Sequence, residues 1–147
     1  MKQVTAAVVA LLMSFISTGI LAETKSAEGA RVFFIGLTDG ARVSSPVTVT
    51  FGLVGMSVAP AGMEKQNSGH HHLLIDRPPF GEGPDGAAEL RQPLPFDAQH
   101  LHFAGGRTEA QIDLPPGRHS LQLVQGDTDH YPHDPPILSD VIEIIVE

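Results

Sequence analysis

Beyond residue 22, apolar positions come in short β-branched runs separated by Gly, Pro and Asp, and no stretch has a convincing 3.6-residue apolar period. The clearest run is 47–54, where Val or another apolar residue alternates with Thr48, Thr50 and Gly52. Further strands are expected at residues 31–37, 69–76, 100–103, 108–114, 118–125 and 139–146. Seven short strands predict an all-β chain that folds as an immunoglobulin-like antiparallel β-sandwich.

The first 22 residues have the layout of a secretory signal peptide. Lys2 precedes a mostly apolar run over residues 4–21, and Ala22 ends it before a charged segment. An uncleaved membrane anchor is the alternative, because the run is about as long as a short membrane span. Cleavage after Ala22 would leave a flexible segment at 23–29 and a single sandwich domain at 30–147, with no membrane association. We therefore expect a periplasmic or secreted protein.

Composition narrows the possible functions. The chain has 147 residues and no cysteine, which excludes disulfides, zinc fingers, thiol nucleophiles, iron–sulfur clusters and blue-copper sites. Its formal net charge is −8, and it becomes −9 after cleavage because Lys2 is the only charged residue before Ala22. This acidic balance argues against a nucleic-acid partner, since such binding needs Lys and Arg to displace counterions.

Histidines carry the clearest chemical signal in this sequence. All eight lie between positions 70 and 133, several of them in i, i+2 pairs on expected strands. Side chains at this spacing share a face of a strand and can converge on one ion. The candidate metal ligands are two strand pairs and two residues of the 126–138 loop: His70, His72, His100, His102, His130 and His133.

The faces of these strands can be assigned only in part. Because Leu101 and Phe103 are apolar, His100 and His102 should point away from the core. The run 73–75 is apolar throughout, so either His71 faces the core and its two neighbours face outward, or the reverse holds. His119 is in phase with Leu121 and Leu123 and is expected on the core face.

Imidazole ligands without thiolate suit copper, zinc, nickel or iron, and we favour a copper ion with zinc as the alternative. Met56 and Met63 could add thioether ligands for Cu(I), although packing explains both residues as well. Ligation requires neutral imidazole, so the metal affinity should decrease below about pH 6.5.

Four ordered histidine-containing motifs carry a resemblance to a known family. They are GHHHLLID (69–76), HLHFAGGRTE (100–109), LPPGRHSLQLVQGD (114–127) and HYPHDPPILS (130–139). With GMSVAPAG (55–62), they make residues 30–147 resemble small bacterial exported proteins catalogued as domain of unknown function 4399. The resemblance implies an exported β-rich domain and supplies no mechanism.

Three functions remain open from the sequence. The preferred one is a periplasmic histidine-rich protein that binds copper for storage, delivery or buffering, with a periplasmic protein as a further partner. The first alternative is a non-metal interaction module that binds envelope proteins or glycans through the long 77–99 loop. A small metalloenzyme is the third, and it is disfavoured because no nucleophile elbow, acid/base pair or phosphate-binding loop is recognisable.

Overall fold

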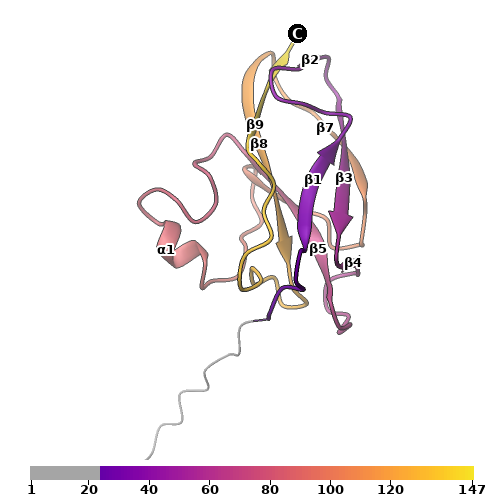
Figure 1. Cartoon of the computed structure of the whole chain (residues 1–147). Helices are drawn as coiled ribbons and strands as arrows, with labels where there is room; N and C mark the ends of the chain where they lie inside the picture. Colours follow the sequence, from indigo (N-terminus) through magenta and orange to yellow (C-terminus); the bar gives the residue numbers. More distant parts are fainter. Residues whose placement is uncertain (1–23) are drawn as a thin grey trace, which may run out of the picture.

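The computed structural model describes residues 24–147, and the predicted signal peptide at residues 1–22 lies outside the described part. Within that part, the chain forms two β-sheets and a single helical turn (Figure 1). No helix among these residues is long and apolar enough to cross a membrane.

The smaller sheet is antiparallel and has the strand order β1-β3-β7. Its strands are β1 (Arg31–Ile35), β3 (Val47–Val54) and β7 (Glu109–Ile112). The larger sheet has the order β2-β9-β8-β5-β4, and β6 also pairs with β5. Its strands are β2 (Arg42–Val43), β4 (Ser57–Val58), β5 (Ser68–Ile75), β6 (His100–His102), β8 (Gly117–Gly126) and β9 (Ile142–Val146).

This topology confirms the immunoglobulin-like sandwich and all seven expected strands. Of these seven, β1, β3 and β7 form one sheet, as in immunoglobulin-like domains. The other four, β5, β6, β8 and β9, lie in the second sheet. The sequence did not reveal β2 and β4, which are two residues long and pair in parallel with β9 and β5. The sequence also did not reveal α1 (Gly86–Glu89), a turn too short to produce a 3.6-residue pattern.

The main core lies between the two sheets and is built from the alternating apolar positions of their strands. Val49, Leu73, Leu121, Leu123 and Ile144 are fully buried at its centre. The alternation predicted for residues 47–54 is confirmed over 47–51, where residues 47, 49 and 51 are buried and Thr48 is exposed, whereas Gly52 is buried as well. The inner faces therefore supply the hydrophobic burial that stabilises the sandwich.

A second, smaller apolar cluster covers the outer face of the larger sheet. Phe80 and Leu94 pack there against Leu74 and Val124. Both come from the long loop that carries α1 (Figure 1). As a result all eight residues of β5 are buried, which explains why the sequence of this strand shows no alternation. Leu73 belongs to the main core and Leu74 to the outer cluster, so His71 faces inward while His70 and His72 face outward.

Candidate metal centre

The pairing of β5 with β6 builds the first part of the site. In this register His72 lies opposite His102, and Leu74 lies opposite His100. Because residues directly opposite in an antiparallel pair share a face, both histidines of β6 lie on the outer face with His70 and His72. The register agrees with the outward orientation predicted for His100 and His102, and it places His70 and His72, whose face the sequence left open, on the same side.

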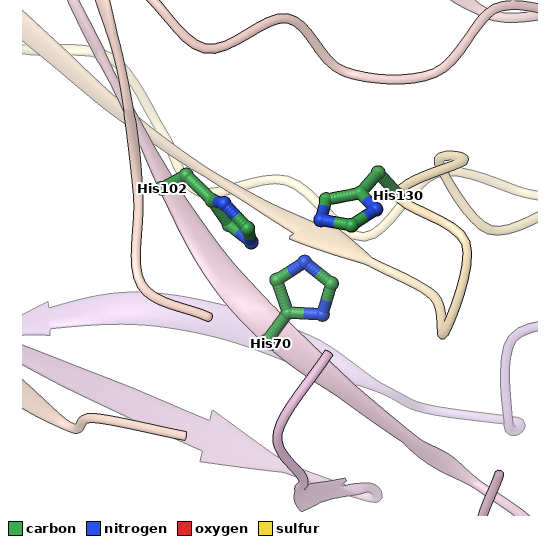
Figure 2. Close-up of side chains that lie close together, drawn as sticks. All are labelled: His70, His102 and His130. Carbon is green, nitrogen blue, oxygen red and sulfur yellow. The ribbon is translucent and has the colours of Figure 1, made fainter. Parts of the chain in front are cut away.

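The third segment of the site is the turn that follows β8. Asp127 is buried, and its Oδ1 accepts hydrogen bonds from the backbone N–H groups of Asp129 (2.9 Å) and Tyr131 (2.8 Å). This turn holds His130 in the left-handed backbone region, with φ of 71°. Such a conformation is uncommon for a residue other than glycine, and it places the imidazole of His130 over the outer face of β5 (Figure 2).

Two further contacts secure this turn. The backbone N–H of Leu94 donates to the carbonyl of His130 at 2.7 Å, which ties the turn to the long loop. The Thr24 hydroxyl donates to Asp127 Oδ2 at 2.6 Å, which ties it to the segment before β1. His130 is therefore positioned by three segments that are remote in sequence.

Three imidazoles from β5, β6 and this turn converge on one point. One nitrogen of each of His70, His102 and His130 lies within 4.8 Å of those of the other two (Figure 2). Bonds of about 2.0–2.1 Å to a tetrahedral ion would require nitrogens roughly 3.4 Å apart, so a closure of at most about 1.4 Å suffices. The group is therefore compatible with metal binding.

His72 lies beside this group and adds a fourth imidazole. Its Nε2 is 3.0 Å from His70 Nε2, and its ring stacks on that of His102 with centroids 4.7 Å apart. The ring occupies the space above Gly126, where an added Cβ would lie 2.8 Å from His72 Nε2. The missing side chain at position 126 is thus what admits His72 to the cluster.

The electrostatics of the cluster favour neutral imidazole. Burial lowers the pKa of His70 to about 4, and repulsion from His102 and His130 contributes to the decrease. Burial lowers the pKa of His72 to about 2, with repulsion from His70 and His102 as the next causes. The pKa of His102 is lowered by burial and by His130. At neutral pH these rings therefore present lone pairs, the form that a metal requires.

Several ring nitrogens of the cluster have no partner within the protein. His70 Nδ1, His72 Nδ1 and His102 Nε2 are buried and make no hydrogen bond. A buried polar atom without a partner costs about 1–3 kcal/mol, so native structures seldom leave several together. The donor set is chemically uniform and fits a metal that prefers imidazole.

Two candidate ligands lie apart from this group. His100 is buried against the Arg77 guanidinium, and its Nδ1 is 3.1 Å from Asp97 Oδ1. His133 is also buried, with its Nδ1 3.3 Å from the carbonyl oxygen of Gln125. Of the six sequence candidates, the structure brings together His70, His102 and His130, with His72 adjacent.

Two residues important for this geometry were not singled out from the sequence. They are Gly126, which leaves room for His72, and Asp127, which holds the turn of His130. The run Gly126–Asp129 is rich in turn-forming residues, and an Asp that accepts backbone N–H groups is a common feature of such turns. That signal could have marked the turn but not its position over β5.

The family profile described as Domain of unknown function (DUF4399) matches residues 49–147, more than half of the chain. This protein belongs to the DUF4399 family. The match confirms the resemblance found in the four histidine motifs, and all eight histidines of the chain lie inside the matched residues. No curated protein sequence matches this DUF4399 chain.

Two solved structures are similar to this DUF4399 protein in outline. An endo-β-1,4-mannanase from Thermotoga petrophila is 14% identical with a TM-score of 0.44, over 80% of this chain and 20% of the mannanase. The fibronectin(III)-like modules of Clostridium thermocellum CbhA are 10% identical with a TM-score of 0.42, over 79% of this chain and 95% of the modules. The DUF4399 chain thus spans about a fifth of the length of the mannanase.

Proposed function

We propose that this protein is a periplasmic metal-binding domain that holds one copper ion on His70, His102 and His130. The observation that carries the proposal is the convergence of three imidazole nitrogens from three separate segments within 4.8 Å. The lowered pKa values of His70 and His102 support it, because both rings stay neutral in the pH range where an ion would bind.

Copper is preferred over zinc on chemical grounds. For a given set of nitrogen ligands, Cu(II) binds more tightly than Zn(II). The group consists of histidines and has no carboxylate or thiolate that would reverse this order. His72 is close enough to His70 to complete a set of four imidazoles, since nitrogens of one ion lie roughly 2.9–3.4 Å apart. Zinc remains the alternative because three histidines also form zinc sites.

The position of the site favours exchange of the ion over permanent retention. His70 is buried, whereas His102 and His130 are partly exposed, so one side of the cluster faces solvent. An ion held there could be captured and released without unfolding the sandwich. This supports a role in copper storage, delivery or buffering in the periplasm, and the acidic charge of the chain would raise the local cation concentration.

Calorimetric titration of the purified protein with Cu(II) and with Zn(II) tests this proposal. We expect one ion per chain, tighter binding of Cu(II) than of Zn(II), and loss of binding in a His70→Ala, His102→Ala variant. A His100→Gln variant is the matched control, because His100 faces Arg77 and Asp97 and should be dispensable for binding. Micromolar or weaker binding by the unaltered protein would disprove the proposal.

A second candidate is an interaction module that contacts an envelope protein. The observation in its favour is Phe96, which is 77% exposed and lies 6.2 Å from the His102 ring at the mouth of the site. A partner that binds equally well in chelator, and is lost in Phe96→Ser, would support this candidate. Binding of such a partner only to the metal-loaded protein would instead indicate copper delivery.

A further inference from the structure

The inner face of the larger sheet carries a second group of unsatisfied polar atoms. Within residues 24–147, every buried side-chain nitrogen or oxygen without a partner belongs either to the outer histidine cluster or to this inner group. The inner atoms are both ring nitrogens of His71, both amide atoms of Gln125, and Nε2 of His133. These three side chains are at most 2% exposed.

The three side chains lie on the same face of the paired strands β5 and β8. His71 is the direct partner of Gln125 in the β5–β8 ladder, so their side chains share the inner face. His133 lies beside Gly69, because its Cε1 would be 3.0 Å from a Cβ at that position. Gly69 is two residues before His71 and therefore on the same face of the strand. His71 and His133 thus lie on the side of β5 opposite His70, and His133 also contacts the backbone carbonyl of Gln125.

The hydrogen bond of His133 determines which of its nitrogens is free. A carbonyl oxygen can only accept, so Nδ1 must donate the 3.3 Å bond to Gln125, and in the neutral ring Nε2 then carries a lone pair. This lone pair is buried and meets no donor. Histidine ligands of metals are commonly prepared in this way, by a backbone carbonyl that accepts from the other ring nitrogen.

His71 offers the second lone pair. Neither of its ring nitrogens has a partner, and a neutral imidazole keeps one unprotonated nitrogen. Its surroundings are apolar, with the Phe51 ring centroid 5.0 Å away. Two neutral imidazoles in an apolar interior are a poor environment for a divalent cation, because no carboxylate in the group offsets its charge.

We propose that His71 and His133 form a second, interior site that binds one copper(I) ion beside Gln125. The lower charge of Cu(I) reduces the desolvation cost, and two imidazoles satisfy an ion that accepts two ligands. The strand β5 then separates two sites, an outer one of at least three imidazoles and an inner one of two. Solvent is the alternative occupant of the inner group.

Anaerobic titration of the purified protein with Cu(I), in competition with a chromophoric chelator, tests the second site. We expect about two equivalents of Cu(I) per chain, against about one of Zn(II). A His71→Phe, His133→Leu variant should bind one equivalent of Cu(I) and retain Zn(II) binding. A His70→Ala, His102→Ala variant should show the reverse pattern, with one Cu(I) retained and Zn(II) binding lost.

A single equivalent of Cu(I) in the unaltered protein that is retained in the inner-face variant, or two equivalents in that variant, would overturn the proposal. Because Zn(II) binding reports the outer site, loss of the inner site and failure of the outer one are distinguishable. Nitrogen-15 spectra of the unaltered protein provide a readout that does not depend on folding of the variants. Diamagnetic Cu(I) should shift the nitrogen resonances of His71 and His133, and unchanged resonances would assign the inner group to solvent.

Discussion

The paired strands β5 and β8 have histidines at both ends, and the two ends use them in opposite ways. At the Asp76 end, the His119 ring has an acceptor for each nitrogen, Asp76 Oδ2 and the Pro115 carbonyl, both at 2.8 Å. Burial alone would lower the pKa of His119, but the hydrogen bonds to Asp76 and Pro115 raise it. This geometry suits a protonated imidazole, because both nitrogens can donate.

At the Gly126 end, the rings of His70, His72 and His102 face mainly one another. Burial and mutual repulsion lower their pKa values, and several ring nitrogens have no partner. The comparison teaches that the neighbours, not the residue type, decide the role of a histidine in this sheet. An imidazole that is given acceptors is favoured in its protonated form, and one that is denied them is favoured in the neutral form that can act as a ligand.

The largest expected effect is on Cu(II) affinity, and it should appear at only one of the two ends. His70→Ala should weaken Cu(II) binding by about 100-fold or more, because it removes a ligand from the centre of the cluster. His119→Gln should leave the affinity unchanged but lower the free energy of unfolding by about 1–2 kcal/mol, because it removes the ion pair with Asp76. Calorimetric titration and urea denaturation of both variants would measure this. A loss of affinity in His119→Gln would break the comparison.

The two ends should also respond to pH with opposite sign in the metal-free protein. The pKa of folded His70 is about 4, so the unfolded chain binds more protons below about pH 6.5, and stability decreases as the pH falls from there. The contribution is on the order of 3 kcal/mol for this histidine alone. His119 has a raised folded-state pKa, so its stabilisation is complete below about pH 6.5 and is lost as the pH rises from there through the folded-state pKa.

Urea denaturation in chelator between pH 4.5 and 8.5 would measure both effects. His119→Gln should remove the loss of stability at the alkaline end and keep the loss at the acidic end. An acidic limb that is unchanged in a His70→Gln variant would contradict the assigned pKa of the cluster.

A smaller effect on Cu(II) affinity is expected when the space above Gly126 is filled. Gly126→Ala places a Cβ 2.8 Å from His72 Nε2, which should displace that ring and weaken Cu(II) binding about 10-fold. Gly105→Ala is the matched control, since a Cβ there meets no heavy atom within 4 Å. Equal affinities of the two variants, measured by chelator competition, would show that His72 does not support the site.

The smallest effect should come from the charge that supports the turn of His130. Asp127→Asn keeps an oxygen for the N–H groups of Asp129 and Tyr131 but removes the negative charge near the bound cation. We expect about a 3- to 10-fold lower affinity for Cu(II), with a weaker dependence on ionic strength. Asp129→Asn, at an exposed position of the same turn, is the control and should change the affinity less.

Much of the scaffold could be read from alternation and turn residues alone. Residues 47–54 alternate because one face is buried and the other is not, and the outward orientation of His100 and His102 follows from Leu101 and Phe103. The faces of β5 could not be read, because the long loop buries its outer side as well. Spacing also could not separate His100 from His102, since Arg77 and Asp97 engage only the former.

The sequence by itself determined an all-β sandwich, the outward orientation of His100 and His102, and the absence of thiolate from any metal site, because the chain has no cysteine. Only the tertiary structure decided which histidines meet. It sets His130 over β5 through a left-handed turn held by Asp127, and it places His133 on the inner face beside Gly69. The reason is physical: strand periodicity acts over neighbouring residues, whereas a metal site depends on distances between segments that only folding brings together.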